Sequence, residues 1–144
     1  MSQSIPSGKV RSGNFYHVGP FIGVGFDEKA GPEIDYTFDE NRVFKHGPIE
    51  LNWKARTDWK EGVLYGTVFS AANASNYLMK VINTDVPIKI PLNLGSDDGI
   101  KVYLNGQLVL GNNIGRGAAP DQEKITLALN KGLNLVLIKI YNGG

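Results

Sequence analysis

The C-terminal third of the chain alternates apolar and polar residues on either side of an Asn-Gly pair, and this pattern constrains the fold most strongly. Residues 100–104 alternate before Asn105-Gly106, and residues 107–110 continue after it. Both central positions of a two-residue hairpin turn need a positive φ, which Asn and Gly adopt most readily. The pattern therefore predicts a β-hairpin.

Short apolar runs with the two-residue period of a strand recur along most of the chain. Residues 133–141 are apolar on both parities, which predicts a central strand covered on both faces. Eighteen glycines and seven prolines fall between the runs, as turns do in β proteins. We therefore predict an all-β fold, an antiparallel β-sandwich of the jelly-roll type. The other predicted strands are one or two within 15–26, then 34–38, 49–55, 63–69, 77–82, 86–94 and 125–129, with turns or loops at 29–33, 41–48, 112–122 and 130–132.

The chain has the length of a single domain. Residues 1–13 are rich in Ser, Gly and basic residues and contain few apolar side chains to bury. We therefore expect a flexible lead-in over 1–13, followed by one sandwich domain over 14–144.

Pro87 and Pro91 lie on the same face of the predicted strand 86–94. Proline cannot donate to a β-ladder, so this strand should have a free or bulged edge.

Composition excludes several classes of function. The net charge of +1 argues against a nucleic-acid binder that neutralises phosphates. Without cysteine there is no disulfide, thiolate metal site or cysteine nucleophile, and two histidines cannot form a three-histidine metal site. No apolar run is long enough to span a bilayer, and no nucleotide-binding or hydrolase motif is present. We find no acid/base constellation and expect no enzyme.

Two polar segments are candidate binding loops. Asp97 and Asp98 lie in a Ser-Asp-Asp-Gly sequence that joins two predicted strands. It forms either a simple turn or part of a Ca²⁺ site, because Ca²⁺ prefers carboxylate and carbonyl oxygens. The loop 112–122 either packs on itself or recognises sugar hydroxyls and carboxylates through side chains suited to planar hydrogen bonding. Its candidate residues are Asn112, Asn113, Arg116, Asp121 and Gln122.

Flat aromatic rings are the usual stacking platforms for sugars. Trp53 shares a parity with apolar neighbours, which favours a core position. Trp59 lies in a polar turn and is the better candidate for an exposed platform. Tyr103 has the opposite parity to Val102 and Leu104, so its ring should face away from their layer, and we include it among the candidate sugar-binding residues.

A resemblance extends these observations. Four motifs follow one another along the chain. They are Leu-Asn-Leu-Gly-Ser-Asp-Asp-Gly over 92–99, the Val-Tyr-Leu-Asn-Gly hairpin over 102–106, Arg116-Gly117 followed by Pro120-Asp121-Gln122, and Lys131-Gly132 followed by Asn134. Together they resemble the galactose-binding-domain-like jelly-roll modules that accompany glycoside hydrolases. The match covers about residues 76–144. More distantly, the chain is similar to protective-antigen-like lectin domains, in some of which a tandem aspartate pair binds Ca²⁺ that in turn holds sugar hydroxyls. That role falls on Asp97 and Asp98.

The resemblance implies a non-catalytic carbohydrate-binding module. Its expected partners are a polysaccharide or oligosaccharide and the other domains of a secreted glycan-degrading protein, with no nucleic acid and no membrane. The extracellular location follows from the resemblance alone. The alternatives are a structural or interaction module without a sugar site and, less favoured, a jelly-roll enzyme acting on polysaccharides.

Overall fold

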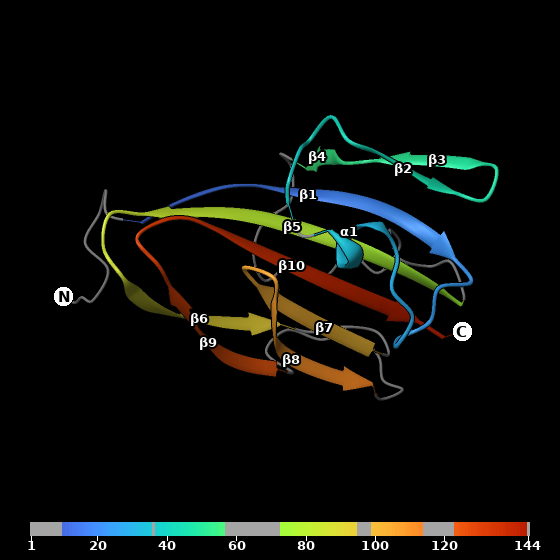
Figure 1. Cartoon of the computed structure of the whole chain (residues 1–144). Coiled ribbons are helices and arrows are strands. Elements are labelled where there is room, and N and C mark those ends of the chain that lie inside the picture. Colours follow the sequence, from blue (N-terminus) through green and yellow to red (C-terminus); the bar gives the residue numbers. More distant parts are fainter. Residues whose placement is uncertain (1–9, 36, 57–72, 95–98, 114–122, 144) are drawn as a thin grey trace.

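The computed structural model describes residues 10–35, 37–56, 73–94, 99–113 and 123–143. Ten strands and one helical turn follow each other along these residues (Figure 1). They are β1 (Val10–Ile22), α1 (Gly31–Ile34), β2 (Val43–His46), β3 (Ile49–Asn52), β4 (Lys54–Arg56), β5 (Ala74–Thr84), β6 (Ile88–Leu94), β7 (Gly99–Leu104), β8 (Gln107–Asn113), β9 (Glu123–Leu129) and β10 (Gly132–Asn142). No described helix is long and apolar enough to cross a membrane.

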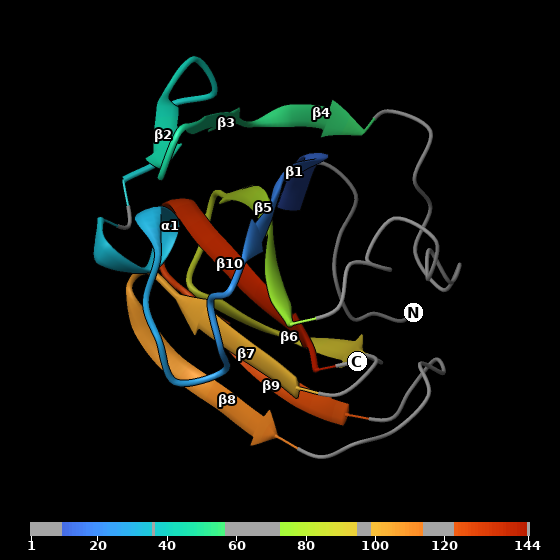
Figure 2. The ribbon, with the colours of Figure 1, turned by 90° about the vertical axis from the view of Figure 1, so that its right-hand side faces the viewer.

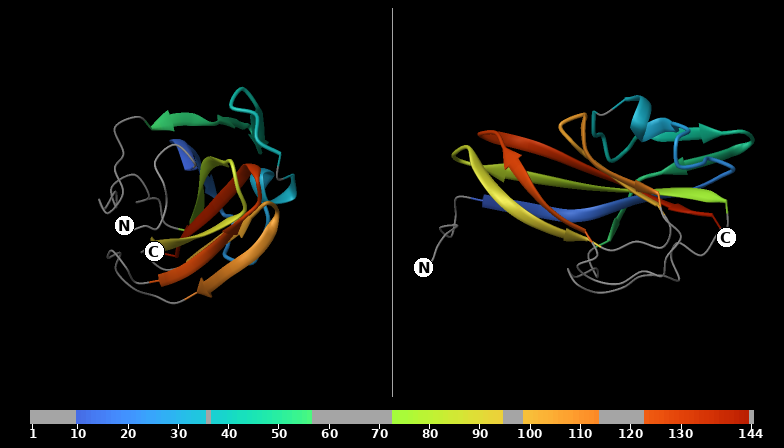
Figure 3. Two further views of the ribbon diagram at one scale, coloured as in Figure 1. Left: turned by 90° about the vertical axis from the view of Figure 1, so that its left-hand side faces the viewer. Right: turned by 90° about the horizontal axis from the view of Figure 1, so that it is seen from below.

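The main sheet has six strands in the order β4-β1-β5-β10-β7-β8. The pairs β2–β3 and β6–β9 form two further small sheets, and every strand pair among the described residues is antiparallel. The β2–β3 hairpin and β4 lie together beyond β1 (Figures 1 and 3). This arrangement confirms the all-β sandwich, with β10 central as its two-sided apolar pattern predicts.

The predicted Asn-Gly turn has the positive backbone φ angles that a two-residue hairpin requires. Asn105 and Gly106 both have positive φ, 51° and 85°, in the β7–β8 hairpin. Asn105 also ties this turn to the start of β10, because its side-chain oxygen accepts a hydrogen bond from the main-chain N–H of Leu135 at 2.8 Å. Pro91 lies in β6, whose described pairing is with β9 alone, so the predicted free edge is confirmed for the described residues.

The six-stranded sheet buries side chains on both faces. We call the side that packs against β6 and β9 the sandwich face. Its buried hydrophobic cluster is entirely aliphatic and comprises Ile82, Ile100, Val102, Leu104, Leu127, Leu129, Val136, Ile138 and Ile140. We call the opposite side the loop-covered face, because the chain between β1 and β3 packs on it (Figure 2). Its buried core comprises Val18, Phe21, Val24, Ala30, Phe44, Trp53, Tyr77, Met79, Tyr103 and Leu137.

Several predicted boundaries were wrong. Residues 10–13 belong to β1, where Val10, Arg11 and Ser12 pair with the end of β5, so the lead-in to 13 is too long; residues 1–9 lie outside the described part. Residues 41–48 contain β2 and the turn to β3 rather than a loop. The predicted strand 63–69 lies outside the described residues.

The predicted strand over 34–38 was also wrong. Pro32 stands in the first turn of α1, and Asp35 ends the helical turn. The Asp35 carboxylate then accepts hydrogen bonds from both the main-chain N–H and the hydroxyl of Thr37, at 3.0 and 2.7 Å. Such local bonds compete with strand formation. Trp53 is buried at 5% exposure, as predicted, but it interrupts the strand predicted over 49–55.

Candidate functional site

Most of the predicted binding residues lie outside the part of the chain that the structure describes. These are Trp59, Asp97, Asp98, Arg116, Asp121 and Gln122. Asn112 and Asn113 are the last two residues of β8, where their backbones pair with Ile100 and Gly99 of β7. Their assignment to a binding site stays a prediction.

The strand ends that flank the two candidate loops lie at one end of the molecule. The chain leaves β6 at Leu94, which pairs with Glu123, the first residue of β9. It enters β7 at Gly99, which pairs with Asn113, the last residue of β8. Gly99 also pairs with Tyr141, near the end of β10. We call this end of the molecule the C-terminal end. Residues 95–98 and 114–122 are both attached to it, and Figure 2 shows the four strand ends on one side with the C-terminus.

The structure corrects the prediction that Tyr103 binds sugar. Its ring faces away from Val102 and Leu104, as predicted, but it lies in the core of the loop-covered face and is 5% exposed. Its hydroxyl donates a hydrogen bond to Glu33 Oε2 at 2.5 Å. A ring that is buried in this way cannot offer a face to a sugar, so we remove Tyr103 from the candidate binding residues.

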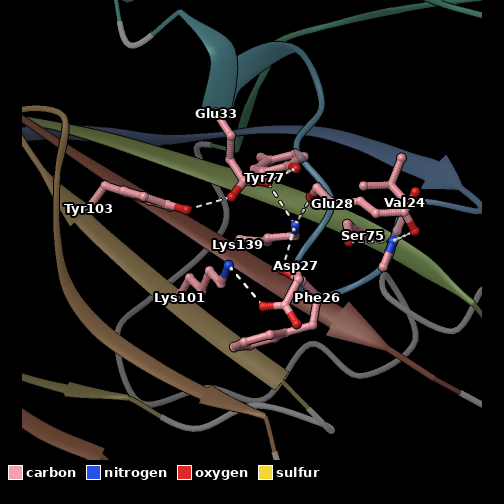
Figure 4. A network of polar contacts seen from close by, with 11 residues as sticks. Val24, Phe26, Asp27, Glu28, Glu33, Ser75, Tyr77, Lys101, Tyr103 and Lys139 are labelled. Carbon is pink, nitrogen blue, oxygen red and sulfur yellow. Dashed lines mark hydrogen bonds and ion pairs between the residues drawn. The ribbon is translucent and has the colours of Figure 1, made fainter.

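A polar network on the loop-covered face was not predicted (Figure 4). Lys139 of β10 pairs directly with Lys101 of β7 on one side and with Tyr77 of β5 on the other. Like charges directly opposite each other destabilise a sheet, and a buried ammonium group needs a close partner. Asp27 lies beside Lys101 with its carboxylate 3.6 Å from Nζ. Lys139 is completely buried and therefore needs stronger compensation.

The chain segment before α1, together with α1, supplies that compensation. Lys139 Nζ donates to the main-chain carbonyls of Phe26 and Glu28 at 3.0 and 2.5 Å. It also forms an ion pair with Glu33 Oε1 at 2.7 Å, and both side chains are 0% exposed. Burial lowers the pKa of Lys139, while the hydrogen bond to Glu33 opposes this effect. These contacts fix the segment to the centre of the sheet.

Both oxygens of the Glu33 carboxylate are engaged. Oε1 accepts from the Tyr77 hydroxyl at 2.5 Å and from Lys139, and Oε2 accepts from the Tyr103 hydroxyl. Burial, with the neighbouring carboxylate, raises the pKa of Tyr77. A buried carboxylate with three donors is a structural anchor and is not poised to meet a ligand. The signal for it in the sequence was the single lysine, Lys139, inside the otherwise apolar run 135–141.

A second polar group lies where β1 meets β4. His17 is 5% exposed, and its Nε2 lies 2.8 Å from Asn76 Oδ1. Arg56 Nη2 lies 3.5 Å from His17 Nδ1. An arginine can only donate, so Nδ1 is the acceptor and Nε2 carries the proton that Asn76 accepts. This is the neutral form of the ring, and burial lowers the pKa of His17, with the positive charges of Arg56 and Lys54 adding to the effect.

A cavity of about 110 Å³ adjoins this histidine, lined by His17, Gly19, Glu50, Leu51, Asn52, Lys54 and Arg56. Gly19 has a φ of +141°, and a Cβ there would come within 2.5 Å of Asn76 Oδ1, so only glycine fits beside the pair. Among the described residues, no group of three metal-ligating side chains comes together. Asp97 and Asp98 lie outside the described residues, and the calcium assignment stays a prediction.

The chain matches no protein-family model. A search of curated proteins finds no match either. Among solved structures, the chain is similar to part of a glycoside hydrolase family 31 α-xylosidase from Xanthomonas citri, with 12% identity and a TM-score of 0.44 over 65% of this chain and 11% of that one. It is also similar to part of a β-glucosidase from Kluyveromyces marxianus solved with glucose, with 14% identity and a TM-score of 0.39 over 89% of this chain and 14% of that one. The chain thus spans a small part of both enzymes. Likenesses at these TM-scores carry no argument about function, and the galactose-binding-like assignment stays a prediction.

Proposed function

We propose that this chain is a non-catalytic carbohydrate-binding module that recognises a polysaccharide. The observation that carries the proposal is the pairing of Leu94 with Glu123 and of Gly99 with Asn113. These pairs bring together, at one end of the sandwich, the strand ends that flank the two candidate binding segments, 95–98 and 114–122. Residues 92–122 also carry most of the resemblance to galactose-binding-like modules.

The proposed mechanism combines stacking and hydrogen bonding at the C-terminal end. Amide, guanidinium and carboxylate groups of the loop 112–122 would bind sugar hydroxyls, and Trp59 would supply a stacking surface. Asp97 and Asp98 would hold a Ca²⁺ ion that orders this end. The module would work within or beside a secreted glycan-degrading protein, linked to its other domains.

The alternative of a structural or interaction module has one specific observation in its favour. An open groove of about 560 Å³ lies on the loop-covered face, between the segment after α1 and the start of β10. Its walls include Phe38 and Leu135, and Leu133 beside them is 68% exposed. Exposed apolar surface of this kind is typical of docking sites for neighbouring domains.

The test is a binding screen of the whole chain against xylan, galactan, β-glucan, alginate and polygalacturonate, in Ca²⁺ and again in EDTA. Retention on one polysaccharide in both buffers would support the module and make Asp97-Asp98 a turn, and retention lost in EDTA would support the calcium mechanism. No retention on any of them would favour the interaction module. Release of reducing ends by the chain alone would establish an enzyme.

Single variants then locate the site. Arg116→Ala should weaken retention about tenfold or more, because a charge-assisted hydrogen bond contributes more than about 1.4 kcal/mol. Arg11→Ala is the matched control. Arg11 is half-exposed, pairs with Asp85, and lies at the opposite end of the sheet, where β1 begins and β5 ends.

A further inference from the structure

Strand β8 forms an outer edge of the six-stranded sheet (Figure 2). It pairs with β7 along one side over Gln107–Asn113. On its other side, no strand pairs with it among the described residues. Within the described part of the chain, alternate main-chain N–H and C=O groups on that side have no strand partner, which is the arrangement that accepts a further strand.

The other outer strands carry charged residues or proline, and β8 carries neither. β4 is three residues long and carries Lys54 and Arg56, while β6 carries Lys89 and Pro91. Charges, prolines, short length and β-bulges are the usual devices that prevent edge-to-edge pairing, and of these β8 has only the bulge at Val109. β8 is the one outer strand of the described sheets that has neither a charged residue nor a proline: its sequence is Gln-Leu-Val-Leu-Gly-Asn-Asn.

The apolar side chains of β8 are also exposed. Leu108 is 54% exposed and Val109 is 42% exposed, whereas Leu110 packs against the aliphatic core. Val109 is the additional residue of a β-bulge, since Leu108 pairs with Tyr103 and Leu110 pairs with Val102. Two adjacent apolar side chains beside an open ladder would both gain burial from a neighbouring strand.

We infer that β8 pairs antiparallel with β8 of a second copy of this chain, across a two-fold axis. A two-fold axis perpendicular to a sheet joins identical edge strands in antiparallel orientation, so the seam is self-complementary. β8 itself is the matching strand, because it is seven residues long and has no charge to repel its copy. The net charge of +1 opposes association very little.

The resulting dimer has one continuous sheet, in which Leu108 and Val109 of both copies are buried at the seam. A seam of one strand pair is at the small end of specific interfaces, so the dimer is in the micromolar range rather than tighter. This pairing does not depend on the proposed function. If the chain does bind polysaccharide, two sites on one dimer would raise its avidity for a polymer.

The test is sedimentation equilibrium of the full chain from low micromolar to near-millimolar concentration. The weight-average mass should rise up to twofold from the monomer value of 15.7 kDa. The double variant Leu108→Lys/Val109→Lys should stay monomeric over the same range. Leu133→Lys, which places the same charge at a leucine that is 68% exposed on β10, should dimerise like the parent chain.

Hydrogen exchange supplies the second measurement. Amides of β8 should gain protection as the concentration rises, while those of β4 at the opposite edge should not. A parent chain that stays monomeric throughout would overturn the inference, and so would a dimer that survives the double lysine variant. Circular dichroism of each variant confirms that it is folded before its mass is interpreted.

Discussion

The two faces of the six-stranded sheet bury their side chains by different physical means. The sandwich face is closed by β6 and β9, and its buried hydrophobic cluster is aliphatic throughout. The loop-covered face is closed by the chain between β1 and β3 and contains a buried ion pair, Glu33–Lys139, with two tyrosine hydroxyls. Both faces bury apolar side chains, but the loop-covered face also requires that its buried ion pair and tyrosine hydroxyls stay paired.

This difference has a consequence for stability. An aliphatic core loses stability in proportion to the volume removed from it. A buried ion pair adds little net stability over apolar residues, but the loss of one partner leaves the other charge uncompensated. The loop-covered face should therefore be more sensitive to a single change and more tolerant of a matched double change.

The largest expected effect is that of Glu33→Ala. It leaves the buried ammonium of Lys139 with only two carbonyl partners, and we expect the free energy of unfolding to fall by about 3–5 kcal/mol. Chemical denaturation measures this directly. Glu40→Ala, at an exposed glutamate, is the control and should change the value by less than about 0.5 kcal/mol.

The double variant Glu33→Met/Lys139→Met sharpens the comparison. With both charges replaced by apolar side chains, the loss should be smaller than that of either single methionine variant. Equal or larger losses in the double variant would show that the pair contributes net stability, contrary to this account.

On the sandwich face, Ile100→Ala should cost about 2–5 kcal/mol through the cavity that it creates. Ile100 is completely buried, and its neighbours in this core are all aliphatic. Ile100→Val removes one methyl group and should cost about 0.5–1.5 kcal/mol. A graded response of this kind is expected on the sandwich face and not for Glu33.

A smaller effect is expected for Tyr103→Phe. It removes one hydrogen bond to the Glu33 carboxylate and keeps the buried ring, so the loss should be about 1–3 kcal/mol. Tyr16→Phe is the matched control, because Tyr16 is half-buried and packs against Phe38 with its ring. A loss no greater than that of the control would mean that Glu33 is held without Tyr103.

The smallest effect is expected from His17 and concerns pH. Burial lowers the pKa of His17 below its ordinary value near 6.5, so in the window between the two values the unfolded chain binds more protons than the folded one. The free energy of unfolding should fall as the pH is lowered through that window. His17→Gln should flatten this slope, and an NMR titration of the parent chain should show the ring of His17 protonating below 6.5.

The sandwich face could be predicted from the sequence, and the cover of the other face could not. Alternation in 100–104, the Asn105-Gly106 turn and the apolar run 133–141 report local strand geometry, and all three predictions were correct. Glu33 pairs with a lysine 106 residues further along the chain. No local period encodes such a contact, although a lysine within an apolar strand does indicate that a carboxylate must be found for it.

For the candidate site, too, some features could be predicted from the sequence and others could not. The strand ends that carry the two polar segments follow from the hairpin and the predicted strands, so their convergence was implicit in the sequence. Tyr103 was assigned to the correct face, but parity cannot tell a solvent-facing layer from one that a distant loop covers. The roles of Asp97, Asp98 and Arg116 depend on side-chain positions that the described residues do not include.

The most direct test of the functional account is to map binding onto the molecule by NMR, using an oligosaccharide of whichever polysaccharide is retained in the screen. The account predicts shifts of the amide signals at the C-terminal end, at Gly99, Asn113 and Glu123, and none at Phe38 or Leu133 in the groove of the loop-covered face. Shifts confined to the groove, or to neither region, would contradict it.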